Sequence, residues 1–284
     1  MPAHRPVSLH DLLTMRLGFG FVMSSPDATP IQRAATALGV MPGLPKPQAP
    51  PVPDEWLRRF ATLPLMHQPG EKWMYPTAFS ILGVLIARGA GQPLETVLRE
   101  RIFEPLGMHD TGFSVPPAKL DRLAACYAVD ADTGTLALYD GVGDSQWRRP
   151  PAFPDADGGL VSTIDDYLAF GHMLLGKGRH GTERIVSRPS VEVMTTNQVA
   201  PEQKIGAEMF LGDNRGWGFG VSVFTRRDDV ASAPGRFGWE GGLGSSWYAD
   251  LSEDIVAILM TQVMGFPSGI LDDFWTSVYQ AIDD

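Results

Sequence analysis

Apolar residues recur at helical spacing through the first three quarters of the chain and alternate with a period of two only in the last quarter. The clearest helical run begins at Ala78, where Phe79, Leu82, Leu85 and Ile86 share one face. Because residues three and four apart meet on one side of a helix, this run predicts a buried helix. Similar patterns predict further helices over residues 8–14, 31–38, 54–60, 94–102, 165–175 and 271–282.

Residues that cap helices stand at the start of several of these runs. Ser8 is an expected N-cap, and Asp11, three residues later, supplies the acidic half of a capping box. Further caps are expected at Asp54, at Ser162 or Thr163, and at Ser187 or Ser190, where one more short helix begins. Residues 41–53 contain too many prolines for regular structure and predict an extended surface loop.

Alternating residues near the end of the chain predict strands. Residues 216–224 are expected to form one strand, followed after a turn by 237–242. Residues 245–250 and 254–262 are expected to form a hairpin, and a smaller hairpin is expected to join 127–129 to 135–138.

Helices followed by an antiparallel sheet and a closing helix indicate an α+β fold. The sequence contains no internal repeat. We therefore expect a single domain over residues 7–282, with a helical and loop-rich region at 7–200 and a sheet with its C-terminal helix at 214–284.

Composition and charge narrow the function classes. Of the 284 residues, 44% are apolar and 20% are charged, and the formal net charge of −10 argues against nucleic acid or an anionic membrane as a partner. The single Cys126 excludes an internal disulfide, and its small apolar neighbours favour a packed thiol over a reactive one. Neither a membrane-spanning run nor a secretory leader is apparent, so the chain as given is expected to be soluble and cytoplasmic.

Tyr75 is the most suggestive candidate for chemistry. It follows the turn pair Pro69-Gly70 and precedes Pro76, which favours an extended conformation at position 75. A phenol fixed at the mouth of a helix can act as a general base if nearby cations lower its pKa from about 10. The alternative is a half-buried tyrosine whose hydroxyl caps a loop.

Other patterns favour ordinary structural roles. The six histidines are scattered without close ligand spacing, so we expect no metal site and no cofactor. The glycines at 216, 218 and 220 lie in an expected strand that no helix follows, which fails the context of a dinucleotide-binding loop. Trp239, flanked by glycines, is either a packed core residue or a pocket wall.

Several spacings together resemble the serine β-lactamase and penicillin-binding-protein-like hydrolases, of the class C β-lactamase and esterase type. The resemblance covers residues 7–282 and includes a Pro-Gly-Glu-x-Trp-x-Tyr segment that leads into a Leu-Gly helix. The other matching segments are Leu9-x-Asp11-Leu12-Leu13-Thr14, Glu104-Pro105-Leu106-Gly107-Met108, Thr111-Gly112-Phe113, Gly158-Gly159-Leu160-Val161-Ser162-Thr163 and Gly241-Gly242-x-Gly244-Ser245.

The resemblance implies roles for particular residues. In the family, the serine of a Ser-x-x-Lys motif forms an acyl-enzyme, the lysine helps to deprotonate it, and the tyrosine of Tyr-x-Asn supplies or relays a proton. By position, Tyr75 is that tyrosine and Thr77 replaces the asparagine. Trp239 and Gly241 belong to the strand that lines the acyl site, and the Gly242 N–H is the expected oxyanion donor.

The nucleophile of the family is absent from the sequence. No serine has a lysine three residues later, and no Gly-x-Ser-x-Gly motif occurs. The resemblance places Ser-x-x-Lys upstream of Val7, so the chain is expected to lack the family's N-terminal strands and nucleophile helix. An unpaired edge of the sheet that begins at Gly216 is then expected to lower stability or to promote self-association.

Two departures from the family pattern bear on the substrate. Thr77 stands where the family has an asparagine, whose amide bonds both the substrate and the lysine. The Thr77 hydroxyl can keep at best one of these hydrogen bonds. Glu240 either repels anionic substrates from the acyl site or points away from it, since neighbours along a strand face opposite sides. We expect a hydrolase for small esters or amides that is N-terminally truncated and inactive as given. The alternative is a non-catalytic homologue that binds a small ligand or partner.

Overall fold

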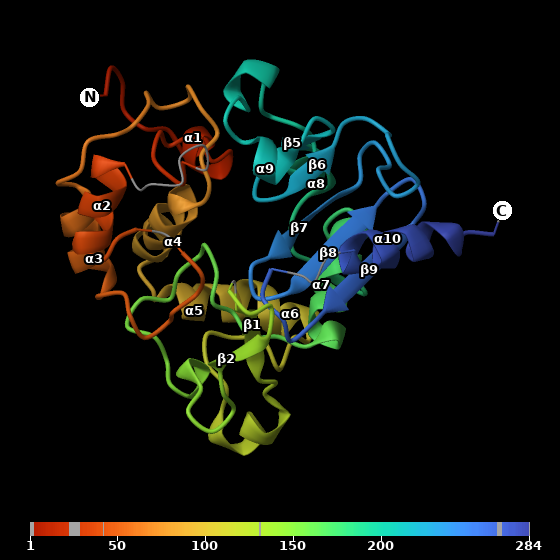
Figure 1. Ribbon diagram of the computed structural model, residues 1–284. Coiled ribbons are helices and arrows are strands. Elements are labelled where there is room, and N and C mark those ends of the chain that lie inside the picture. The colour runs from red at the N-terminus through yellow and green to blue at the C-terminus, as the bar shows by residue number, and fades with distance from the viewer. Residues whose placement is uncertain (1–2, 23–28, 42, 131, 266–268, 284) are drawn as a thin grey trace.

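A layer of helices lies beside an antiparallel sheet (Figure 1). The computed structural model describes residues 3–22, 29–41, 43–130, 132–265 and 269–283. The first helices gather on one side of the molecule: α1 (Leu9–Leu13), α2 (Pro30–Ala37), α3 (Pro53–Phe60) and α4 (Thr77–Ala90). The sheet and the C-terminal helix lie on the other side. The predicted α+β class is confirmed.

The first helices begin largely as their caps predict. The Ser8 hydroxyl accepts the Asp11 N–H at 3.1 Å and the Asp11 carboxylate accepts the Ser8 N–H at 2.8 Å, so the predicted capping box is present. The expectation that Asp54 caps α3 is wrong. That helix begins at Pro53, which tolerates the first position because it has no N–H to leave unpaired, and Asp54 lies in the first turn.

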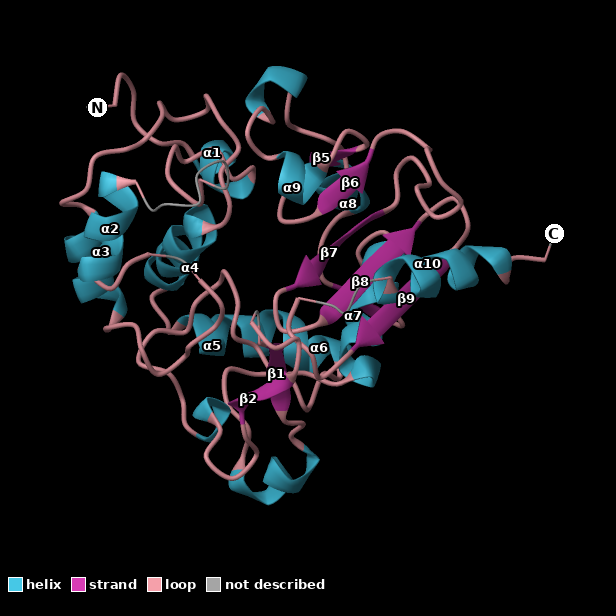
Figure 2. Ribbon diagram, in the orientation of Figure 1, coloured by secondary structure: helices cyan, strands magenta, loops and turns pink. Residues whose placement is uncertain are grey.

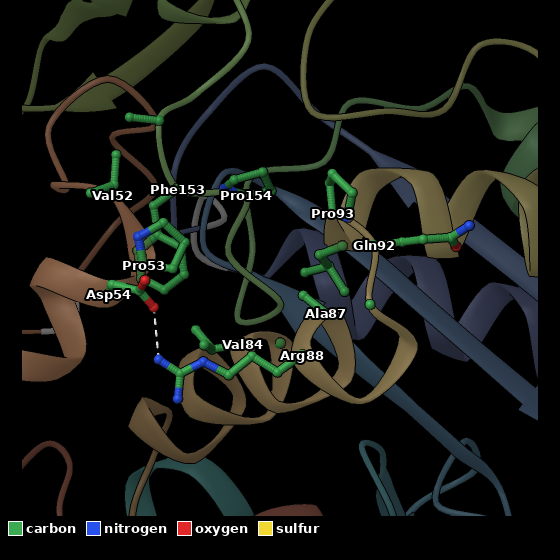
Figure 3. Close-up of a pocket in the computed structure, with 14 residues that line it drawn as sticks. Val52, Pro53, Asp54, Val84, Ala87, Arg88, Gln92, Pro93, Phe153 and Pro154 are labelled. Carbon is green, nitrogen blue, oxygen red and sulfur yellow. Dashed lines mark hydrogen bonds and ion pairs between the residues drawn. The ribbon is translucent and has the colours of Figure 1, made fainter.

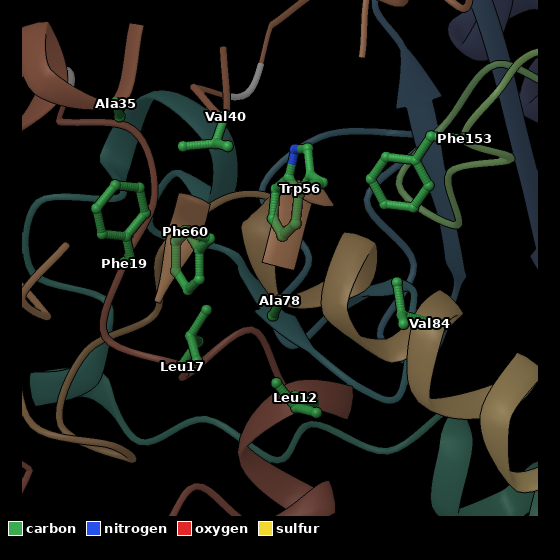
Figure 4. Close-up of a cluster of buried hydrophobic side chains, with 10 residues drawn as sticks. All are labelled: Leu12, Leu17, Phe19, Ala35, Val40, Trp56, Phe60, Ala78, Val84 and Phe153. Atoms are coloured by element: carbon green, nitrogen blue, oxygen red, sulfur yellow. The ribbon is translucent and has the colours of Figure 1, made fainter. Parts of the chain in front are cut away.

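The helix α4 packs against the N-terminal helical layer. Its Ala78 and Val84 join a buried apolar cluster with residues of α1, α3 and the 17–19 segment (Figure 4). Within this cluster Trp56 stacks on Phe60 at 5.3 Å between ring centroids. α4 is therefore held in place along its length, and the residues at its start are positioned by this packing.

The chain between α4 and the sheet is a series of short elements. α5 (Leu94–Leu98) continues through a π-helical turn (Arg99–Phe103) into α6 (Glu104–Leu106), so the predicted end before Glu104 is too early. The remaining elements are the hairpin of β1 (Cys126–Val129) and β2 (Leu136–Asp140), α7 (Ile164–Leu175), β3 (Arg179–His180), β4 (Glu183–Arg184), α8 (Arg188–Met194), α9 (Glu208–Leu211) and three short 3-10 helices (Pro117–Arg122, Gln146–Arg148, Pro201–Gln203).

The sheet is a five-stranded antiparallel meander in sequence order. Its strands are β5 (Arg215–Trp217), β6 (Ser222–Phe224), β7 (Phe237–Gly241), β8 (Ser245–Asp250) and β9 (Ile255–Met260). The prediction of one strand over 216–224 is wrong because the Gly218 N–H donates to the Val221 carbonyl at 2.8 Å and Gly220 takes a φ of 86°. Glycine adopts this φ freely, so the segment folds back as two strands.

Helices cover both faces of the sheet (Figure 2). On one face, a Cβ added at Gly171 of α7 would lie 2.7 Å from Val256 and 2.9 Å from Trp247, so glycine allows close packing there. On the other face, α10 (Ile270–Gln280) places Trp275 in contact with Tyr248 at 5.3 Å between ring centroids. Trp247 and Tyr248 face opposite helices because successive strand residues alternate.

Candidate active site

Tyr75 is fixed by backbone hydrogen bonds to two distant segments. Its carbonyl accepts the Phe21 N–H at 2.7 Å, and the preceding Met74 N–H donates to the Met15 carbonyl at 2.8 Å. The Trp73 N–H donates to the Gln203 carbonyl at 2.9 Å. The Tyr75–Pro76 peptide bond is cis. The phenol is therefore presented by a backbone held on both sides, immediately before α4.

Four aromatic rings surround the Tyr75 phenol. Ring centroids lie 4.9 Å away for Phe210, 5.6 Å for Trp239, 6.1 Å for Trp73 and 6.2 Å for Phe21. Trp73 is buried, whereas the other four rings of this group are only half-buried. The Trp239 indole N–H donates to the Tyr75 hydroxyl oxygen at 3.4 Å. We call these five residues the Tyr75 cluster.

The Tyr75 hydroxyl stays protonated at neutral pH. Burial raises its pKa to about 12, and the Asp157 and Glu240 charges act in the same direction, against the opposing hydrogen bond from Trp239. A phenol acts as a base only if nearby cations lower its pKa. Among the described residues, no cation lowers the pKa of Tyr75. The group is suited to donating or relaying a proton.

Two buried oxygens near the start of α4 have no hydrogen-bond partner within the described part of the chain, namely Thr77 Oγ1 and Asp157 Oδ1. Thr77 is the first residue of α4 and is almost fully buried. The 155–157 loop packs on the same helix, where the Ser80 hydroxyl donates to Asp155 at 3.0 Å. Burial raises the pKa of Asp157 well above its usual value, and Asp155 adds to this. Both oxygens are acceptors that protein atoms cover in this structure.

The strand β7 brings Trp239 to Tyr75 and turns Glu240 away from it. Trp239 reaches Tyr75, while Glu240 turns to the other face of the sheet and accepts the Tyr248 hydroxyl at 2.6 Å. Arg215 also pairs with Glu240 at 3.2 Å, so this carboxylate has a counter-charge. Of the two orientations considered for Glu240, these contacts agree with the one that points away from the acyl site. Because Arg215 pairs with the Glu240 carboxylate, that carboxylate repels anions less.

Gly241 is the last residue of β7, and Gly242 begins the turn that follows it. The Gly241 carbonyl accepts the Gly244 N–H at 3.0 Å, and the Gly242 carbonyl accepts the Gly265 N–H at 3.2 Å. A Cβ at Gly242 would lie 2.8 Å from Leu44, so the proline-rich 43–52 loop approaches this turn. The roles of both glycines remain predictions.

A separate hollow of about 570 Å³ lies away from these residues, between the start of α3, the end of α4 and the 152–154 loop (Figure 3). Its wall includes Val84, Ala87 and Phe153, and an exposed ion pair of Arg88 with Asp54 at 2.7 Å stands at its side. None of the predicted site residues lines it.

Across the described residues, no three histidine, cysteine or acidic side chains gather as a metal would require. The helices described are also too short or too polar to cross a bilayer.

The helical layer beside a five-stranded antiparallel sheet has the β-lactamase/transpeptidase-like fold. The chain belongs to the beta-lactamase family, whose model matches residues 1–277. Protein Rv1367c of Mycobacterium tuberculosis is 38% identical over 274 residues, covering 92% of this chain and 63% of that protein. Esterase EstB of Burkholderia gladioli is 28% identical, covering 90% and 64%. The chain thus spans slightly less than two thirds of these relatives.

Solved structures share the fold. Simvastatin synthase LovD from Aspergillus terreus superposes with a TM-score of 0.74 at 20% identity, covering 99% of this chain and 70% of that one. The hydrolase EstCE1, described as having promiscuous acyltransferase activity, also gives 0.74 at 22% identity, covering 96% and 71%.

Sequence reasoning missed Phe21, Phe210 and Asp157 as neighbours of Tyr75. Phe210 lies in the apolar run Met209-Phe210-Leu211, which carries no sign of a site. The three residues reach the phenol only through tertiary packing, so no local pattern could have found them.

Proposed function

We propose that the Tyr75 cluster is the acyl site of an esterase-type serine hydrolase that acts on small esters or amides. The observation that carries this proposal is the contact between Tyr75 and Trp239, 164 residues apart, through ring packing at 5.6 Å and a hydrogen bond. Membership of the beta-lactamase family and the esterases among its relatives support the same class.

Each predicted residue has a role in acyl transfer. The neutral Tyr75 phenol relays a proton between the attacking hydroxyl and the leaving group, and Trp239 orients its oxygen. Thr77 offers its unpartnered hydroxyl to the substrate. The Gly242 N–H stabilises the oxyanion and Gly241 keeps the strand close to the acyl group. Half-buried Phe21 and Phe210 give the substrate an apolar wall.

The attacking serine and its lysine are the missing parts of this reaction. The sequence contains no Ser-x-x-Lys, and the raised pKa of Tyr75 gives no base to activate another serine. For the 284 residues as given, we therefore expect the Tyr75 cluster to bind a small ester or amide without cleaving it.

Covalent labelling tests whether a nucleophilic serine is present, and calorimetry tests whether the Tyr75 cluster binds a ligand. Purified protein is treated with a fluorophosphonate and with p-nitrophenyl acetate, and we expect no labelled serine and no hydrolysis above background. A labelled serine whose labelling is lost in Tyr75→Phe would show that a nucleophile is present.

Binding of phenylacetamide, measured by isothermal titration calorimetry, tests the acyl site. We expect its affinity to fall at least fivefold in Trp239→Ala and to be unchanged in the remote control Phe274→Ala. Equal affinity in all three proteins would contradict the assignment.

A further inference from the structure

The proline-rich loop of residues 43–52 is tied to the part of the chain around β2. The Pro45 carbonyl accepts the hydroxyl of Tyr139, a β2 residue, at 3.0 Å. The Gln48 side-chain amide donates to two backbone carbonyls of the 146–149 segment, at 2.9 and 3.0 Å. These hydrogen bonds fix the first half of the loop in one position.

Leu44, near the start of this loop, packs on the turn that follows β7. A Cβ added at Gly242 would lie 2.8 Å from the Leu44 Cδ2 atom, so this methyl group is in van der Waals contact with the Gly242 backbone. The next residue, Pro45, lies against Gly158, since a Cβ added there would be 3.6 Å from the Pro45 ring. Proline fixes φ, and Pro47 is buried, so the backbone that presents Leu44 has little freedom.

The contact between Leu44 and Gly242 bears on the size of the ligand. An oxyanion lies about 2.7–3.1 Å from the N–H nitrogen that stabilises it. A carbonyl group bound to the Gly242 N–H therefore has the first carbon of its acyl group within reach of the Leu44 side chain. Leucine is branched and apolar, so it favours an apolar acyl group and leaves less room for a bulky one.

We propose that Leu44 is a specificity-determining residue of the acyl site, and that its side chain excludes acyl groups branched beside the carbonyl. The ligand class is thereby narrowed to esters and amides of unbranched acyl groups, such as arylacetyl groups. This inference rests on the proposed function, because it takes the Gly242 N–H as the oxyanion donor.

Two amides that differ by one branch test this role. Isothermal titration calorimetry compares phenylacetamide with racemic 2-phenylbutanamide, which carries an ethyl group beside the carbonyl. Leu44→Ala removes an isopropyl group and should raise the affinity for 2-phenylbutanamide at least fivefold, because one excluded methylene commonly costs a pocket about tenfold or more. Its affinity for phenylacetamide should change less than twofold, whereas loss of a merely structural leucine would shift both affinities alike.

A matched control is Leu251→Ala. Leu251 is an exposed leucine that follows β8, whereas Gly242 lies before the start of that strand. The two residues are therefore separated by the length of β8, and the Leu251 variant should leave the ratio of the two affinities unchanged. An equal change of this ratio in both leucine variants would overturn the inference.

Trp239→Ala separates a failure of this inference from a failure of the proposed function. We expect this variant to bind both amides more weakly. If it does so and Leu44→Ala leaves the ratio of affinities unchanged, the role of Leu44 is wrong and the acyl site stands. If Trp239→Ala changes neither affinity, or if the protein binds neither amide, the proposed function is wrong and this inference falls with it.

Discussion

Two aromatic clusters pack against the same sheet and differ in how exposed their rings are and in how many of their polar atoms are hydrogen-bonded. In the Tyr75 cluster every ring except Trp73 is half-buried, and the charges acting on the phenol are acidic. Nearby Thr77 and Asp157 have oxygens without partners in the described chain. In the second cluster, which we call the Arg236 cluster, a buried guanidinium lies 4.0 Å from the Trp275 ring centre and is also enclosed by the rings of Phe224, Tyr248 and Tyr279.

Most polar atoms around Arg236 are paired, and the exception among the described residues is the buried Nε of Arg236 itself. The Tyr279 hydroxyl donates to Asp250 at 2.6 Å, the Trp275 indole N–H donates to Ser246 at 3.1 Å, and Arg236 itself donates to the Ala231 carbonyl. Closed, paired aromatic clusters stabilise a fold, whereas open ones with unpaired polar atoms are typical of binding sites. Aromatic content alone therefore does not identify a site; exposure and hydrogen bonding do.

The largest expected difference between the clusters is in stability. Trp275→Ala should lower the free energy of unfolding by about 3–5 kcal/mol, because it removes a buried ring and opens a cavity beside Arg236. Phe210→Ala, at a half-buried ring, should cost less than half as much. Urea denaturation followed by circular dichroism measures both, and equal losses would remove the distinction.

The same chemical change at two tyrosines sharpens the comparison. Tyr279→Phe removes the donor to the Asp250 Oδ2 atom, while Ser252 and the Glu253 N–H still donate to Oδ1, and it should cost about 1–3 kcal/mol. Tyr75→Phe removes a hydroxyl whose described contact is a long one to Trp239, and should change stability by less than about 1 kcal/mol. A larger loss at Tyr75 would mean that its hydroxyl is structural.

Acid should weaken the Arg236 cluster through Asp250. Burial raises the pKa of this carboxyl, but hydrogen bonds from Ser252, Tyr279 and the 252–253 backbone outweigh it, so the pKa lies below its usual value. The stabilisation is present above the unfolded pKa of about 4 and is lost as pH falls through the lower folded pKa. Urea denaturation from pH 6 to pH 2.5 measures the free energy of unfolding at each pH. In Asp250→Asn this free energy should fall less steeply with acid, and an equally steep fall would show that Asp250 is not the group responsible.

Alkali should act on the Tyr75 cluster, with a smaller effect. The Tyr75 pKa is raised to about 12, so its contribution to stability is complete below the unfolded pKa of about 10 and is lost as pH rises towards 12. Burial raises the pKa of several tyrosines, so tyrosinate absorbance should show more than one late-ionising phenol, and Tyr75→Phe should remove the one that ionises near pH 12. Loss of a group that ionises near pH 10 instead would show an exposed phenol.

The sequence predicted correctly those caps and hairpins whose interacting residues lie within a few positions of each other. The Ser8 capping box, the Thr163 cap of α7, the Ser187 cap of α8 and both hairpins are present because their residues interact within a few positions. The prediction of one strand over 216–224 was wrong because apolar and small residues keep alternating through the turn. The positive φ of Gly220, which marks this turn, is not visible in the sequence pattern.

The site was predictable only in part. Tyr75 and Trp239 came from spacings shared with a family, and the structure brings them together. Phe21 and Phe210 join them through packing between segments more than 50 residues from Tyr75 along the chain, which periodicity does not encode. The ion pair that neutralises Glu240 likewise depends on the register of β5 with the sheet.

The backbone contact beneath Tyr75 limits how this protein can diversify. A Cβ at Gly20 would lie 2.4 Å from the Tyr75 carbonyl oxygen, so any other residue there would displace the phenol itself. The next residue, Phe21, bears a half-buried ring that can be exchanged without moving that backbone. Under the proposed function, changes of ligand preference are expected at positions 21 and 210, whereas a side chain at position 20 would shift the Tyr75 backbone.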